Sequence, residues 1–189
     1  MHPALKAHLD GKIELTAEHE ELVNSCFKPI KAKRGELLVR KGNIARQVYF
    51  VIQGCLRVFL IGEDGNEWTR FLIFEGRMGT AFPSYILREP SMAAVQSLEP
   101  SELLALSYED RQLLLRTIPG LERYMRIGLE QDYIASIQRI ESLIMLDAKS
   151  RYNQLLDAHP ELIQRLPARI IADYLGISQE TLSRLKGKR

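Results

Sequence analysis

The chain has 189 residues, of which 46% are hydrophobic and 26% charged, and its net charge is +2. These proportions are normal for a folded protein with an apolar core and exclude an intrinsically disordered chain. No apolar run approaches the roughly 20 residues that cross a bilayer, and Met1–Lys6 contains no apolar signal region. We therefore expect no membrane partner and a cytoplasmic location.

Residues 1–26 are predicted to form short helices, one of which has Thr16 as its N-cap, followed by acidic residues in its first turn. Cys26 and Cys55 lie in apolar surroundings, and neither belongs to a Cys-x-x-Cys pair. We therefore expect two free, buried thiols and no zinc or iron–sulfur site.

Residues 27–107 have the pattern of an antiparallel β fold. Short apolar segments are separated by glycine-containing turns at intervals of about ten residues. The sharpest turn contains Asp64-Gly65, where glycine permits the positive φ that a tight hairpin needs. The pattern predicts a jelly roll or barrel. The predicted strands are Leu37–Val39, Val48–Ile52, Leu56–Leu60, Trp68–Phe74, Ala93–Leu98 and Leu103–Leu106.

After about Ser107 the pattern becomes helical, and Leu121–Leu146 contains no proline and a single glycine, Gly128. Its apolar residues form one face of a helix of about seven turns. This face could pack on its own domain or form a dimer seam, and the heptad-like run is too short for periodicity to decide. The face comprises Leu121, Met125, Leu129, Tyr133, Ile137, Ile140 and Ile144, widened by Ile127 and Ile134.

The segment from Pro167 to Arg189 is typical of a helix-turn-helix. Pro167 suits the first turn of a helix, and Gly176 suits the left-handed residue that ends it. Ser178 can then cap a second helix. Ala172 is small where the second helix would cross closely. A shared apolar core is predicted from Ile171, Leu175, Ile177, Leu182 and Leu185.

With those residues buried, the second helix presents a polar face that suits a major groove. Arginine can pair bidentately with guanine, glutamate can accept from the cytosine amino group, and glutamine can contact adenine. Double-stranded DNA is therefore the expected partner. The candidate base-reading residues are Gln179, Glu180, Ser183 and Arg184, and the candidate phosphate contacts are Ser178, Thr181, Lys186, Lys188 and Arg189.

The motif Ile171–Arg184 resembles the recognition motif of the Crp–Fnr regulators, the catabolite-activator family. Lys33–Leu38, Gly42, Tyr49–Gly54 and Arg57-Val58 are similar to the opening of that family's cyclic-nucleotide-binding β-roll. The resemblance extends over roughly Leu15 to Lys186.

The resemblance implies an α+β protein in which the β-roll senses a signal, the long helix forms a homodimer and the helix-turn-helix binds a palindrome. It implies base-reading roles for Glu180 and Arg184, favours the seam interpretation of the long helix and makes RNA polymerase a candidate partner. The expected domains are a sensor over 1–118 that includes the N-terminal helices, a dimerisation helix over 119–146 and a DNA-binding domain over 147–189.

The sequence departs from the family pattern at the expected effector pocket. Members that bind cyclic nucleotides carry a Gly-Glu pair and then an Arg followed by Ser or Thr. Here Gly79 is followed by Thr80, and the expected arginine position is Pro90. Burying a phosphate without a paired cation costs several kcal/mol, so we predict no tight binding of cyclic AMP. The residues of this candidate pocket, whose effector is unknown, are Gly79, Thr80, Phe82, Arg88 and Ser91.

A second departure concerns the end of the chain. Many family members place a β-wing after the recognition helix, which needs roughly ten or more residues. Only Gly187, Lys188 and Arg189 follow Lys186. We therefore expect no wing, with backbone contacts made by helix ends and the basic tail.

Two functions other than DNA binding are alternatives. A metal-dependent cupin enzyme needs clustered histidine ligands, but the four histidines all lie outside residues 27–107. We expect neither an enzyme nor a bound cofactor or metal. The other alternative is a β-roll that binds a ligand or a protein and has lost DNA binding, and the intact spacing from Ala172 to Leu185 argues against it.

Overall fold

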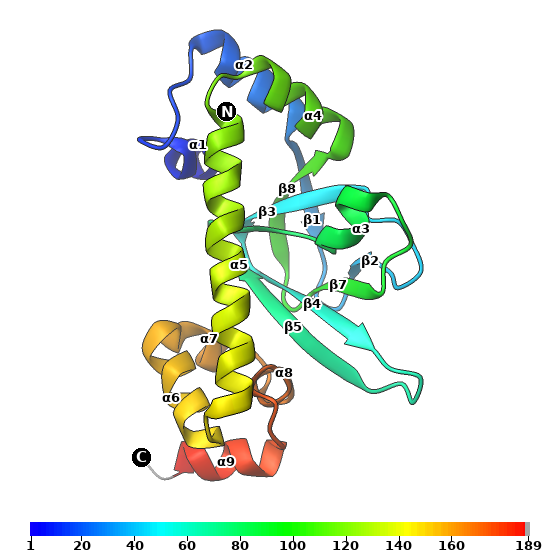
Figure 1. The fold of residues 1–189 in the computed structure, drawn as a ribbon, viewed down its shortest axis with the longest axis vertical. Helices are drawn as coiled ribbons and strands as arrows, with labels where there is room; N and C mark the ends of the chain where they lie inside the picture. The colour runs from blue at the N-terminus through cyan, green and yellow to red at the C-terminus, as the bar shows by residue number, and fades with distance from the viewer. Residues whose placement is uncertain (188–189) are drawn as a thin grey trace. The chain divides into compact units, whose positions relative to one another are not determined.

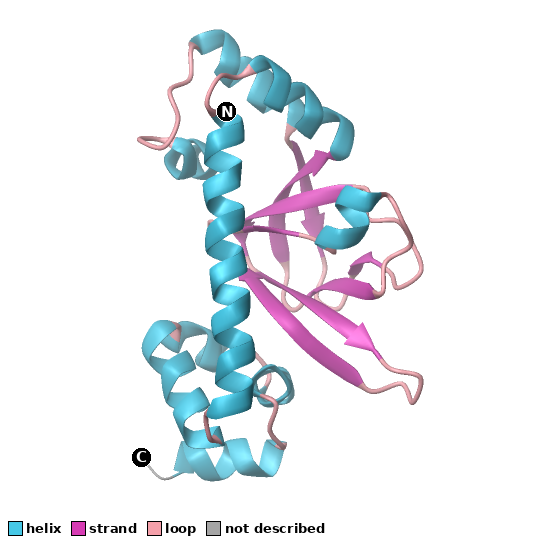
Figure 2. Ribbon diagram, in the orientation of Figure 1, coloured by secondary structure: helices cyan, strands magenta, loops and turns pink. Residues whose placement is uncertain are grey.

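The computed structural model describes residues 1–187, which form the predicted α+β fold. The chain divides into two compact units (Figures 1 and 2). The first comprises Met1–Asn66 and Arg70–Ile127, and the second comprises Glu67–Thr69 together with the chain from Gly128 onward. This division falls inside the long helix α5, and the three-part division expected from the sequence stays a prediction.

The first unit is an antiparallel β-roll of two four-stranded sheets, in the strand orders β1-β8-β3-β6 and β2-β7-β4-β5. Every predicted strand is present. The strands are β1 (Lys28–Ala32), β2 (Leu37–Val39), β3 (Gln47–Gln53), β4 (Cys55–Ile61), β5 (Glu67–Phe74), β6 (Met78–Gly79), β7 (Ala93–Ser97) and β8 (Ser101–Ser107).

The core of the roll lies between the two sheets. Phe50 and Leu103 come from one sheet and Leu56 and Val95 from the other, and all four side chains are buried in one apolar cluster. Both cysteines are free and buried, as predicted. The helices of this unit are α1 (Pro3–Leu9), α2 (Ala17–Cys26), α3 (Phe82–Leu87) and α4 (Tyr108–Thr117), followed by the start of α5 (Leu121–Met145).

The sequence pattern does not predict two of the strands and one helix, and each omission has a physical reason. β1 contains Pro29, which the pattern counts against a strand, yet β1 lies at the edge of its sheet, where a missing N–H is tolerated. β6 has only two residues, and its pairing with Tyr49 and Phe50 of β3 defines it. The six-residue α3 is too short to show a helical period.

The second unit is helical around a small apolar core that includes Tyr152, Leu162, Ile171 and Leu182. Asp147 caps one of its helices by accepting a 2.7 Å hydrogen bond from the Ser150 N–H, which lowers the pKa of the aspartate. Among residues 1–187, no helix combines the length and apolarity needed to cross a membrane. After α5, the helices are α6 (Ala148–Ala158), α7 (Pro160–Arg165), α8 (Ala168–Leu175) and α9 (Gln179–Gly187).

We predict that replacing each of two glycines of this unit by alanine changes its stability in opposite directions. Gly176 has φ +65°, so Gly176→Ala should destabilise the unit by about 1–2 kcal/mol because a Cβ strains a left-handed residue. Gly128 lies within α5, where an added Cβ meets nothing within 4 Å, so Gly128→Ala should stabilise the helix by up to about 1 kcal/mol. Urea unfolding followed by circular dichroism measures both changes, and equal effects would contradict this account.

Candidate nucleic-acid interface and effector pocket

Residues 168–187 form two helices joined by a tight turn at Gly176. Gly176 has φ 65° and ψ 41°, and its N–H donates to the carbonyl oxygen of Asp173 at 3.0 Å. The N–H of Ile177 donates to the carbonyl oxygen of Ala172, also at 3.0 Å. These two bonds close the last turn of α8 and send the chain directly into α9.

Ser178 caps α9, as the sequence predicts. Its Oγ accepts a 3.1 Å hydrogen bond from the Thr181 N–H, and its carbonyl oxygen accepts one of 3.0 Å from the Leu182 N–H. The exposed N–H groups at the start of a capped helix, together with its dipole, favour anions such as phosphate.

The two helices share the predicted core only in part. Ile171, Leu175 and Leu182 are buried, and Ala172 is buried at the close approach of the helices. Ile177 and Leu185 are half-buried at its margin. The three central residues therefore hold α9 against α8, and the polar face of α9 is left outside.

All four candidate base-reading residues are exposed on this outer face. The Arg184 guanidinium donates to Thr181 Oγ1 at 3.2 Å. The pKa of Glu180 is lowered because its carboxylate bonds its own backbone N–H and Ser178. The charge of Arg184 makes a smaller contribution, and Glu180 stays ionised. The face thus presents hydrogen-bond donors and acceptors of the kinds that read base edges; its members are Gln179, Glu180, Ser183 and Arg184.

The candidate phosphate contacts surround this face. Ser178 and Lys186 are exposed and Thr181 is half-buried at the start of α9. Lys188 and Arg189 lie outside the described residues.

In the β-roll, the polar groups of the candidate effector pocket are already bonded within the protein. Thr80 is buried and its Oγ1 donates to the Gln47 carbonyl oxygen at 2.7 Å. Ser91 is also buried, and its Oγ donates to the Ala93 carbonyl oxygen at 2.7 Å. A Cβ placed on Gly79 would lie 2.2 Å from Ile73 Cδ1, so the Ile73 side chain covers this glycine.

The other two pocket candidates do not join these buried groups. Phe82 is 39% exposed at the start of α3. Arg88, at the end of α3, has a left-handed backbone with φ 60°. Its guanidinium donates to the Ala45 carbonyl oxygen at 3.2 Å, lies 5.0 Å from the centre of the Tyr108 ring and is 3.7 Å from the Glu109 carboxylate.

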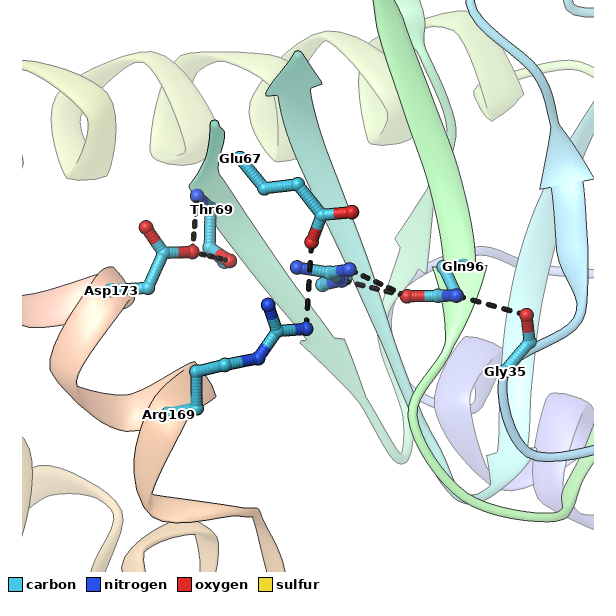
Figure 3. A network of polar contacts seen from close by, with 7 residues as sticks. Gly35, Glu67, Thr69, Gln96, Arg169 and Asp173 are labelled. Carbon is cyan, nitrogen blue, oxygen red and sulfur yellow. Dashed lines mark hydrogen bonds and ion pairs between the residues drawn. The ribbon is translucent and has the colours of Figure 1, made fainter. Parts of the chain in front are cut away.

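The sequence pattern does not predict that the roll contains a buried arginine, Arg57. The Arg57 side chain on β4 is 2% exposed, and its Nε and Nη2 donate to Gln96 Oε1 at 2.9 and 2.7 Å. The guanidinium also lies 3.8 Å above the Phe59 ring, and Gln96 in turn donates to the Gly35 carbonyl oxygen (Figure 3). The alternation of side chains along β4 places Arg57 on the face opposite to the core residues Leu56 and Val58. Only the fold shows that Gln96 bonds it.

The described part of the chain contains no group of three or more His, Cys, Asp and Glu side chains arranged to hold a metal ion.

Comparison with known proteins finds one family model for part of the chain and relatives that span most of it. Residues 29–117 match the family described as Cyclic nucleotide-binding domain. The Cyclic AMP receptor protein of Thermus thermophilus is 26% identical over 175 residues, which cover 90% of this chain and 81% of the relative. The cAMP-activated global transcriptional regulator CRP of Pasteurella multocida is 22% identical over 158 residues, or 78% of this chain and 76% of the relative.

Solved structures show the same fold. The c-di-GMP responsive global regulator CLP of Xanthomonas campestris superposes with a TM-score of 0.72 at 19% identity, covering 92% of this chain and 91% of that one. Residues 29–117 therefore match a cyclic nucleotide-binding domain, and over most of its length the chain is similar to proteins named as cyclic AMP receptors and transcriptional regulators.

Proposed function

We propose that this protein is a dimeric, sequence-specific DNA-binding regulator whose β-roll does not bind cyclic AMP tightly. The observation that carries DNA binding is the geometry around Gly176. There, a closed left-handed turn and the Ser178 cap present an exposed polar face on α9. A relative whose name describes a transcriptional regulator supports the same assignment.

Dimerisation is supported by the apolar side chains that α5 leaves uncovered within one chain. Tyr133, Ile137, Ile140 and Ile144 follow one another at spacings of four, three and four residues, which is the spacing of a coiled-coil seam. Their exposed fractions are 69%, 38%, 53% and 77%. A second copy of α5 would remove this apolar stripe from water. It would also place two α9 helices in successive major grooves about 34 Å apart.

Four features of the roll argue against tight binding of cyclic AMP. Thr80 replaces the expected acid, and its hydroxyl is bonded to Gln47. Ile73 covers Gly79. Pro90 stands where an arginine is expected. The buried Arg57 guanidinium is oriented toward Gln96 by two hydrogen bonds, so pairing it with a phosphate would require breaking them.

Selection of bound sequences from a random duplex pool, at low and moderate salt, tests the function as a whole. We expect a near-palindrome with half-sites one helical turn apart. Arg184→Ala should reduce affinity by about 1–3 kcal/mol and relax one base position in each half-site, because a bidentate contact to guanine is lost.

Lys186→Ala is the matched control, since loss of a phosphate contact weakens binding to all sequences alike and flattens the salt dependence. An unchanged selected sequence with Arg184→Ala would contradict base reading. No enrichment by the folded wild-type protein would favour a β-roll that acts without DNA.

The seam predicts that Ile144→Glu converts the dimer to a monomer, because a carboxylate would be buried opposite its symmetry mate. Sedimentation velocity measures the change. Leu87→Glu, at a residue that is 64% exposed on α3, provides the control and should leave the dimer intact. A dimer that survives Ile144→Glu would place the interface elsewhere.

Calorimetric titration with cyclic AMP should give no binding in the micromolar range. Thr80→Glu should not restore it, because the single acid would supply no cation for the phosphate. Micromolar affinity of the wild-type protein would overturn this part of the proposal.

A further inference from the structure

Strand β5 is divided between the two units. Glu67, Trp68 and Thr69 belong to the second unit, whereas β5 continues from Arg70 in the first. Thr69 is 3% exposed although it lies at the beginning of its strand. The second unit thus includes a short segment, Glu67–Thr69, that is separated along the chain from the rest of the unit, which begins at Gly128.

Asp173 of α8 bonds this segment directly. Its Oδ2 accepts a 2.7 Å hydrogen bond from the Thr69 N–H and a second one from Thr69 Oγ1 (Figure 3). Hydrogen bonds to an ionised carboxylate are roughly twice as strong as neutral ones. One carboxylate oxygen therefore fixes both the backbone and the side chain of Thr69.

Arg139 of α5 joins the same group from the other side. Its Nη2 donates to the carbonyl oxygens of Thr69 at 3.2 Å and of Tyr174 at 2.6 Å, and its guanidinium lies 3.8 Å above the Tyr174 ring. Burial lowers the pKa of Arg139, against the opposing effects of Tyr174 and Asp173, but an arginine remains charged. Arg169 of α8 adds an ion pair to Glu67 at 3.6 Å on the more exposed side (Figure 3).

These contacts are separate from the apolar core that holds the two helices together. Asp173 is half-buried, whereas Ile171, Leu175 and Leu182 form the α8–α9 contact. The carboxylate and the guanidinium instead connect α8 to α5 and to β5. Because α9 is packed on α8, whatever holds α8 also orients the exposed face of α9.

We propose that Thr69, Arg139 and Asp173 form a polar clamp that fixes the orientation of α9 on α5. Where the proposed DNA-binding function holds, on which this consequence rests, the clamp sets the spacing between the two recognition helices of a dimer. The backbone of β5 continues from Thr69 to Arg70 of the first unit, so the clamp lies beside a covalent connection between the two units.

The orientation can be measured without DNA. Spin labels at Glu141→Cys on α5 and Ser183→Cys on α9, both exposed positions in the second unit, report the distance between the two helices. Native Cys26 and Cys55 are buried, which favours labelling of the introduced thiols. Mixing labelled chains with excess unlabelled chains restricts the signal to pairs within one molecule.

We expect a narrow distance distribution in the otherwise wild-type chain and a broad one after Asp173→Ala or Thr69→Val. Thr69→Ser retains the hydroxyl and should keep the distribution narrow. Asp157→Ala, which removes an exposed carboxylate from α6, should do the same. Distributions that stay narrow in both clamp variants would overturn the proposal.

The clamp variants Asp173→Ala and Thr69→Val, without the spin-label cysteines, are then tested for binding to the palindrome selected by the wild-type protein and to one isolated half-site. Loss of a charge-assisted hydrogen bond should reduce affinity for the palindrome roughly tenfold and broaden the tolerated spacing. Affinity for the half-site should not change. Equal losses on both duplexes would overturn the spacing role. If the wild-type protein selects no DNA but the clamp variants broaden the distance distribution, the DNA-binding function fails and the clamp itself is supported.

Discussion

The left-handed backbone at Gly176 determines how this chain presents the exposed polar face of α9. It ends α8 and allows two hydrogen bonds to close the last turn, so that Ser178 can cap α9 immediately afterwards. A side chain at this position would meet Leu143 of α5 at 3.3 Å as well as straining the backbone. The angle between the helices, the burial of Leu182 and the exposure of Arg184 all follow from this one turn.

The β-roll uses its buried polar groups for its own structure. Thr80, Ser84 and Ser91 are buried on or near the short helix α3, and each hydroxyl bonds a backbone carbonyl of this chain. A buried hydroxyl without a partner costs a few kcal/mol, so these bonds fix the loops around α3 in the absence of a ligand. The polar groups of the candidate pocket thus serve the structure of the roll itself.

Polar contacts in both units link segments that lie far apart along the chain. In the first unit, Arg57 bonds Gln96 on a paired strand, and Tyr124 bonds His8, 116 residues away. In the second unit, Asp173 and Arg139 link segments that lie 104 and 70 residues away along the chain. Contacts over such separations hold only in the folded unit, and few local interactions replace them when one is removed. They are therefore suited to transmit a change in one element to another.

The sequence by itself determined the order of the elements, because glycine turns, period-two strands and the four-residue spacing of α5 are local signals. It also determined the outer face of α9, since the apolar residues and the caps leave only one face for Gln179 and Arg184. Only the tertiary structure decided which segments meet. Pro29 could join an edge strand because β8 lies on one side of it alone. Thr69 meets Asp173 for the same reason: such pairs arise from chain topology, and no local pattern encodes them.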